Sequence, residues 1–127
     1  MKLTGLITCL LLVGMVFAGA GDGSWLRKVP EKDRSRLNPL SNDPDAAAAG
    51  GKIYAAHCAS CHGDNGEGKM SGRHYRPNLH SKRVKDATPG ELYWLLTNGS
   101  LRNGMPSWSR FPEPERWQIV TYLKSLH

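Results

Sequence analysis

The chain has 127 residues, and 17 Lys and Arg against 11 Asp and Glu give it a formal net charge of +6. This length suits one domain with a limited hydrophobic core. Beyond the first 20 residues no long apolar run occurs, so the sequence predicts no membrane span there. For an exported chain, this modest basic excess argues against a nucleic-acid partner and favours a protein partner with an acidic docking surface, which it would attract by electrostatic steering.

Residues 1–20 have the composition of a secretory signal peptide. Lys2 is followed by an apolar run over residues 3–17 and by Ala18-Gly19-Ala20, which resembles a signal-peptidase cleavage site. The run is too short to span a bilayer. We therefore expect export to the periplasm and removal of the signal, which lowers the net charge from +6 to +5 because Lys2 is its only charged residue. Retention of residues 1–20 as a membrane anchor is the alternative.

Residues 21–43 are polar, charged and interrupted by proline, with Trp25-Leu26 as their one apolar pair. This composition predicts an extended N-terminal arm. The arm either wraps the following domain or docks on a partner, and both interpretations remain open at this point. Residues 44–127 form the predicted compact domain.

Three helices are predicted in that domain. The first runs from Pro44 to about His57, with Asp43 as its N-cap. The second begins with a capping box at Thr88 and Glu91 and ends near Gly99. The last begins near Pro114, where apolar residues recur with helical spacing: Ile119, Tyr122, Leu123 and Leu126. No segment predicts a strand, so the fold class is all-α, with three to five helices and long loops that need a cofactor to order them.

The run Cys58-Ala59-Ser60-Cys61-His62 is a C-x-x-C-H motif, which is typical of c-type heme attachment. Its two thiols can add to the two vinyl groups of one heme, and His62 can then bind the iron. Two other interpretations of the cysteines are weaker. A zinc site with His74 and His80 would need both histidines on one helix, which Pro77 would break. A thioredoxin-type redox pair would need a strand before the motif.

Two methionines outside residues 1–20, Met70 and Met105, are candidates for the second iron ligand. Met105 lies in an Asn-Gly-Met-Pro loop, far enough from His62 for the chain to reach the opposite heme face. Met70 follows His62 by only eight residues, so Met105 is favoured. Several histidines could bind iron in principle, although surface or structural roles are favoured for them: His57, His74, His80 and His127.

Over residues 44–127 the chain resembles the class I c-type cytochromes. The resemblance rests on four sequence motifs: Gly50-x-x-Ile53-Tyr54-x-x-x-Cys58-x-x-Cys61-His62-Gly63, Pro77-Asn78-Leu79, Gly104-Met105-Pro106 and Tyr122-Leu123-Lys124. It implies the small cytochrome c fold around one covalently attached heme c. It further implies that His62 and Met105 are the axial ligands and that Cys58 and Cys61 form the thioethers. In this family pattern the Pro77 carbonyl accepts a hydrogen bond from the His62 ring, Leu79 packs on the heme, and Gly50 allows the first and last helices to cross closely.

The predicted function is single-electron transfer between periplasmic redox proteins rather than catalysis, because two protein ligands would leave no open position on the iron. Basic residues could rim a docking patch for an acidic redox donor or acceptor: Lys69, Arg73, Arg76 and Arg102. The alternative is a heme-bearing subunit held permanently in a dehydrogenase or oxidase complex. An enzyme or gas sensor with an open iron would require that Met105 does not bind.

Overall fold

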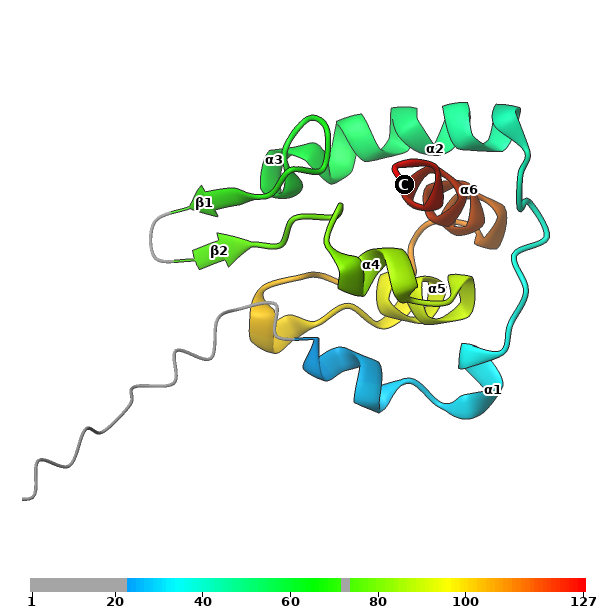
Figure 1. The fold of residues 1–127 in the computed structure, drawn as a ribbon, viewed down its shortest axis with the longest axis horizontal. Helices are drawn as coiled ribbons and strands as arrows, with labels where there is room; N and C mark the ends of the chain where they lie inside the picture. The colour runs from blue at the N-terminus through cyan, green and yellow to red at the C-terminus, as the bar shows by residue number, and fades with distance from the viewer. Residues whose placement is uncertain (1–22, 72–73) are drawn as a thin grey trace, which may run out of the picture.

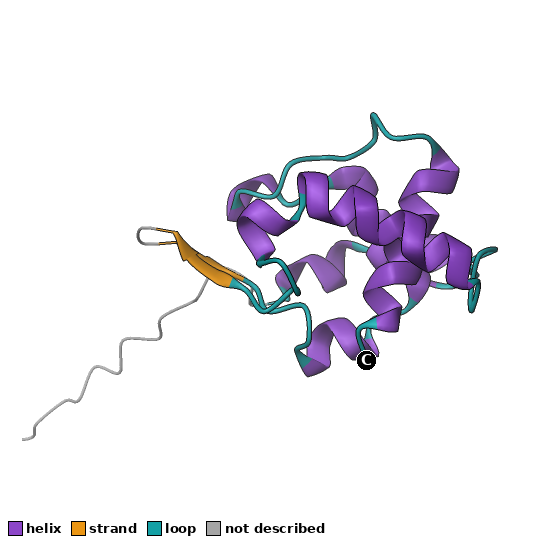
Figure 2. Cartoon of the chain, turned by 90° about the horizontal axis from the view of Figure 1, so that it is seen from above, coloured by secondary structure: helices purple, strands orange, loops and turns teal. Residues whose placement is uncertain are grey.

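The computed structural model describes residues 23–71 and 74–127. The predicted signal peptide at residues 1–20 lies outside these residues. Three helices of ten or more residues form the body of the fold, namely α2 (Pro44–His57), α5 (Pro89–Asn98) and α6 (Glu113–Ser125). Shorter helical elements connect them: the 3-10 turns η1 (Ser24–Lys28) and η2 (Leu101–Asn103), and the helices α1 (Glu31–Arg34), α3 (Ala59–His62) and α4 (Lys82–Asp86). The predicted all-α class is confirmed (Figures 1 and 2).

Local hydrogen bonds explain where two of the long helices begin. The Asp43 carboxylate accepts hydrogen bonds from the backbone N–H groups of Asp45 and Ala46 at 2.9 and 3.2 Å. At the start of α5 the Thr88 hydroxyl accepts from the Glu91 N–H at 3.1 Å, and the Glu91 carboxylate accepts from the Thr88 N–H at 2.7 Å. These bonds satisfy N–H groups that a helix start would otherwise leave unpaired.

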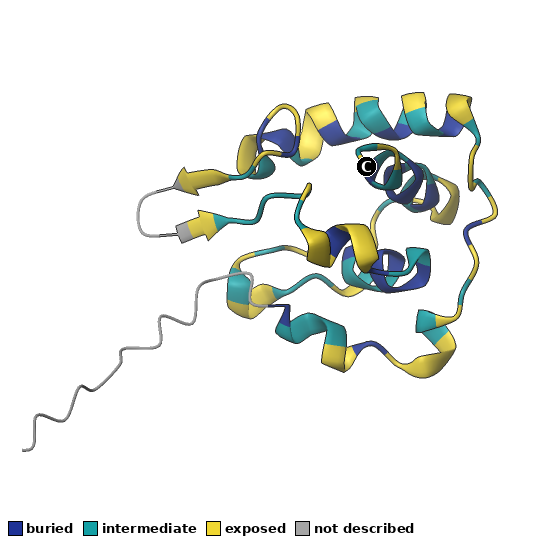
Figure 3. Ribbon diagram, in the orientation of Figure 1, coloured by how far each residue is buried: buried dark blue, intermediate teal, exposed yellow. Residues whose placement is uncertain are grey.

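The core forms where α2 crosses α6. A Cβ placed on Gly50 would lie only 2.0 Å from the backbone oxygen of Gln118, so the two helices approach closer than any side chain at position 50 would allow. Beside the crossing, the rings of Tyr54 and Tyr122 pack with their centroids 5.1 Å apart. Figure 3 shows buried residues concentrated on α5, on α6 and on the face of α2 toward α6.

One element was not predicted. Strands β1 (Lys69–Ser71) and β2 (His74–Arg76) form an antiparallel hairpin that pairs Met70 with Tyr75. The expectation that the domain contains no strand was therefore wrong. Three-residue strands are too short to show alternation in the sequence, and these two bond only to each other.

The sequence predicted an extended N-terminal arm. In the structure the arm is extended only in part, because η1 and α1 interrupt it. It wraps the domain and packs along α5, where the Arg34 guanidinium pairs with the buried Glu91 carboxylate. Trp25 and Leu26 pack against the hydrophobic core. Short helices of this kind are ordered by tertiary contacts and carry almost no signal in the sequence.

Candidate cofactor site

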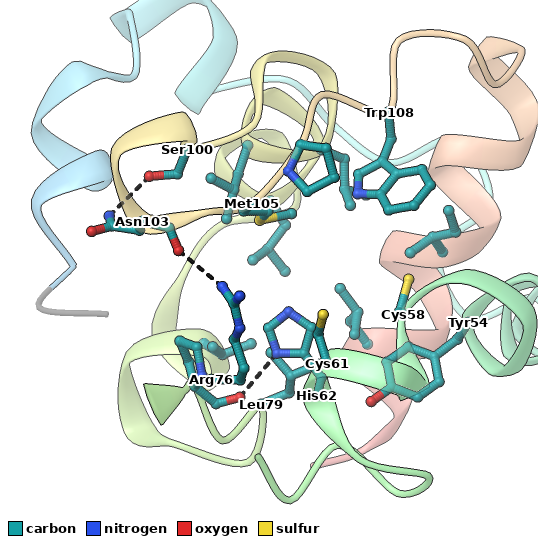
Figure 4. Close-up of a pocket in the computed structure, with 18 of the residues that line it drawn as sticks. Tyr54, Cys58, Cys61, His62, Arg76, Leu79, Ser100, Asn103, Met105 and Trp108 are labelled. Atoms are coloured by element: carbon teal, nitrogen blue, oxygen red, sulfur yellow. Dashed lines mark hydrogen bonds between the residues drawn. The ribbon is translucent and has the colours of Figure 1, made fainter. Parts of the chain in front are cut away.

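The six residues predicted to bind the cofactor line one pocket of about 350 Å³ (Figure 4). They are Cys58, Cys61, His62, Pro77, Leu79 and Met105. Much of the remaining wall is apolar and comes from α5, α6 and the loop after η2: Leu92, Leu95, Leu96, Pro106, Trp108, Ile119 and Leu123. The structure thus brings together every residue of the predicted site, and their individual roles stay predictions.

The end of α2 presents the cysteines and the histidine to the pocket. The chain turns at Cys58, whose carbonyl accepts from the N–H groups of Cys61 and His62 at 3.1 and 2.9 Å, and α3 follows. The buried Tyr54 hydroxyl donates to the Gly63 carbonyl at 2.6 Å, which fixes the end of this turn. Both thiols are free, and burial together with the nearby Cys61 raises the pKa of Cys58 to about 11.

Pro77 determines the tautomer of His62. The His62 Nδ1 lies 3.0 Å from the Pro77 carbonyl oxygen, which can only accept a hydrogen bond. Nδ1 therefore carries the proton, and the neutral ring keeps its lone pair on Nε2. Burial lowers the pKa of His62, and the positive charge of Arg76 lowers it further. The hydrogen bond to Pro77 acts in the opposite direction and raises the pKa. The outcome is a neutral imidazole, the form that binds metal.

Met105 lies on the wall opposite His62 (Figure 4). A backbone bridge holds it there, because Ser100 and Met105 exchange two N–H···O bonds of 2.8 and 3.1 Å. The backbone N–H of Trp108 donates to the Leu96 carbonyl at 2.8 Å, and this bond anchors the loop on α5. Met70, the competing methionine, is 68% exposed on β1 and does not line the pocket.

The other predicted ligand sets find little support. Among residues 23–70 and 75–127, whose side chains the structure describes, no three His, Cys, Asp or Glu gather as a metal site would require, and the His74 side chain of the zinc alternative lies outside this set. His80 Nε2 lies 2.6 Å from the Asn65 carbonyl oxygen, and His57 packs against the rings of Trp108 and Phe111. The cysteine motif follows helix α2 and not a strand, which also disfavours a thioredoxin-type pair.

Several wall residues were not among the predicted cofactor-binding residues, and two of them are informative, although Arg76 was expected at the rim of a docking patch. Trp25 reaches the pocket from η1, outside the segment that resembles a known family, and Arg76 reaches it from the end of β2. Only the position of Arg76 next to Pro77 could have pointed to it. No sequence pattern connects Trp25 with a pocket whose other walls begin some thirty residues later.

Comparison with known proteins assigns the family. Residues 45–123 match the family described as cytochrome c oxidase, cbb3-type, subunit III. The chain is a class I c-type cytochrome of this family. A relative named cbb3-type cytochrome c oxidase subunit FixP, from Azorhizobium caulinodans, is 33% identical over 80% of this cytochrome and 34% of its own length. Another relative, named cbb3-type cytochrome c oxidase subunit CcoP, from Azospirillum brasilense, is 32% identical. The match covers 71% of this cytochrome and 32% of the relative.

This cytochrome therefore spans about a third of the length of these curated relatives. Its fold resembles the crystal structure of cytochrome cL from Methylophaga aminisulfidivorans, with a TM-score of 0.56 and 24% identity over 68% of this chain and 57% of the other. In the described residues, no helix is both long and apolar enough to cross a membrane.

The pocket fits the heme c that such a cytochrome carries. Two free thiols at one edge, a ligand-competent imidazole on one wall and a thioether on the other match the needs of a covalent, six-coordinate heme. The apolar lining suits a flat macrocycle that must be shielded from water.

Proposed function

We propose that this cytochrome transfers single electrons through one covalently bound heme c as a subunit of a membrane oxidase complex of the cbb3 type. The observation that carries the electron-transfer role is the placement of His62 and Met105 on opposite walls of one apolar pocket, beside Cys58 and Cys61. The sequence contains one C-x-x-C-H motif, which supports a single heme.

In this proposal Cys58 and Cys61 would hold the heme through thioether bonds, and His62 Nε2 and the Met105 sulfur would bind its iron. The heme iron, when bound, supplies a one-electron couple. The Pro77 carbonyl orients the His62 ring and raises its basicity. The soft sulfur of Met105 would favour the reduced state and would keep a substrate or gas from the iron. The role is therefore electron transfer rather than catalysis.

The relatives favour attachment to an oxidase over free diffusion. Those named here are called subunits of cbb3-type oxidases, and the family carries the same description. A freely diffusing carrier, which the sequence alone favoured, remains the contrary outcome of the experiment below. The partner surface is proposed to be acidic, because the chain without residues 1–20 has a net charge of +5, and because Arg76 lines the pocket while further basic residues occur in β1 and η2: Lys69 and Arg102. The proposed location is the periplasm, which is supported by the signal-like residues 1–20.

This assembly can be tested by expressing the full chain with a C-terminal affinity tag in the native host and isolating the membranes. After mild detergent extraction, the tagged cytochrome should co-elute with heme–copper oxidase activity, at a size far above its own 14.0 kDa. The co-elution should persist in high salt, which screens weak surface attraction. The control is the Cys58→Ala/Cys61→Ala chain, in which covalent heme is absent. Elution at monomer size from the soluble fraction would instead support a shuttle.

A further inference from the structure

Arg76 occupies an unusual position in the pocket wall. It precedes Pro77, whose carbonyl bonds His62, yet its Nη1 donates to the carbonyl of Asn103 at 3.1 Å, two residues before Met105. Its side chain therefore connects the loop beneath His62 with the loop that carries Met105 (Figure 4). Any flat cofactor between these two ligands must have its rim beside the guanidinium.

The guanidinium has bonding capacity that the protein does not use. Arg76 Nε is buried and has no hydrogen-bond partner among the described residues. A buried N–H without a partner costs about 1–3 kcal/mol. Gly104 leaves the room that this arrangement needs, since a Cβ at that position would lie 2.8 Å from Arg76 Nη1.

The charge of the pocket points to an anionic ligand group. Two arginines, Arg76 and Arg83, line it, and the described lining contains no Asp or Glu. A bound molecule with a negative group would therefore satisfy the unpaired Nε of Arg76 and balance its charge. A planar guanidinium matches a carboxylate through two parallel N–H···O bonds.

Heme carries its carboxylates on the half opposite the vinyl groups that form the thioethers. Figure 4 shows Cys58 and Arg76 on opposite sides of the His62 ring. The thioether attachment would thus direct the two propionates away from Cys58, toward the side on which Arg76 lies.

We infer that the Arg76 guanidinium, through Nε and its outer nitrogens, binds a heme propionate and joins it to the Met105 loop through Asn103. This inference rests on the proposed heme site. Two functions follow from one side chain: the propionate is fixed, and a positive charge at the rim of the heme disfavours the additional charge of the oxidised state.

The test uses the heme-loaded protein and the Arg76→Gln variant. Resonance Raman spectra contain a propionate bending band whose frequency falls when hydrogen bonds to the propionate are lost. We expect this band to shift to lower frequency in Arg76→Gln and the midpoint potential to fall. Arg76→Lys keeps the charge but lacks the planar fork, so the band should still shift while most of the potential is restored.

Arg102→Gln is the matched control, because Arg102 is an exposed basic residue of the same region that does not line the pocket. It should leave the Raman band unchanged. An unshifted band in Arg76→Gln, with covalent heme and methionine ligation intact, overturns this inference and leaves the proposed function standing. If Arg76→Gln does not accumulate, the band of Arg76→Lys decides in the same way. Heme that is not covalent in the parent chain overturns the proposed function itself.

Discussion

Met105 and Met70 show how one residue type takes opposite environments in this chain. Met105 is held at the pocket by the paired backbone bonds to Ser100, whereas Met70 stands exposed on a hairpin. A side chain on a loop that other contacts already order loses less conformational entropy when it binds a metal. The backbone bridge therefore favours Met105 as the ligand independently of the sequence pattern.

Substitution of Met105 by Ala should open one face of the iron. We expect loss of the weak long-wavelength charge-transfer band of methionine-bound ferric heme, binding of carbon monoxide to the ferrous protein, and a lower midpoint potential. Met70→Ala is the matched control and should leave all three unchanged. Ready binding of carbon monoxide by the parent protein, or a large effect of Met70→Ala, would contradict Met105 ligation.

Tyr54 links helix α2 to the turn that follows the histidine. Tyr54→Phe should lower the free energy of unfolding by about 1–2 kcal/mol, because the Gly63 carbonyl loses its bond from the hydroxyl. Tyr122→Phe tests the neighbouring ring of the same pair, and its effect should be smaller. If urea unfolding gives the same loss of unfolding free energy for both substitutions, the hydrogen bond to Gly63 adds no stability of its own.

The same tyrosine predicts a dependence of stability on pH. Burial raises the pKa of Tyr54 above its ordinary value of 10.0, with smaller contributions from nearby negative groups. The unfolded chain therefore loses this proton at lower pH than the folded chain does. The contribution of the protonated Tyr54 hydroxyl to the free energy of unfolding is complete below about pH 10 and is lost as the pH rises further. Unfolding free energies of the parent and Tyr54→Phe proteins should thus converge above pH 10, and a constant difference would contradict the shift.

At the scale of elements, the arm behaves as part of the domain. Three kinds of contact fix it: the ion pair of Arg34 with Glu91, a 2.9 Å bond from the Asn38 side chain to the Thr121 hydroxyl, and Arg36 lying over the Tyr93 ring. Glu91 is only 5% exposed, so its carboxylate depends on Arg34 and on the backbone N–H of Thr88, which donates to it at 2.7 Å.

Removal of the cation from this pair should destabilise the protein. We expect Arg34→Leu to lower the free energy of unfolding by about 2–3 kcal/mol, less than for a fully buried pair because Arg34 is partly exposed. Lys32→Leu, an exposed cation of the same short helix, should change it by less than about 0.5 kcal/mol. Urea unfolding measures both, and indistinguishable midpoints would mean that the arm contributes no stability through Glu91.

The crossing of α2 and α6 gives a sharper contrast between two adjacent positions. Gly50→Ala would place a methyl group 2.0 Å from a backbone oxygen, so the helices must separate, at a cost of about 3 kcal/mol. Gly51→Ala meets only the Tyr122 ring, at 3.2 Å, and that side chain can move. We expect a cost below about 1 kcal/mol there. Comparable thermal unfolding of the two variants would show that the close approach at Gly50 is not required.

For the whole molecule, the pocket is large relative to the protein. The pocket of about 350 Å³ is lined by residues of all three long helices, so an empty pocket leaves much of the apolar surface of the core without packing partners. The cofactor therefore supplies core that the chain itself lacks.

Covalent attachment can be tested together with this dependence. Acid–acetone should extract no heme from the parent protein and should remove it from the Cys58→Ala/Cys61→Ala variant. The same variant, produced without heme, should show a broad thermal transition and reduced helix content by circular dichroism. Extraction of heme from the parent would refute the thioethers, and a sharp, parent-like transition of the heme-free variant would refute the structural role.

The sequence by itself determined the features that depend on residues close together in the chain. The caps at Asp43 and Thr88, the spacing of Cys58, Cys61 and His62, and the helical periodicity of α6 all involve residues a few positions apart, where geometry follows directly from the backbone. The motifs shared with the cytochromes added Pro77 and Met105, which lie far apart in the sequence and are brought to one pocket in the structure.

Only the tertiary structure decided the rest. Arg34 and Glu91 are 57 residues apart, Asn38 and Thr121 are 83 apart, and Arg76 and Asn103 are 27 apart, so nothing local specifies these pairs. The same holds for Trp25 in the pocket wall and for a hairpin of three-residue strands. Such contacts form because packing of the whole domain must satisfy buried polar groups wherever the chain brings them together, and that condition belongs to the folded molecule as a whole.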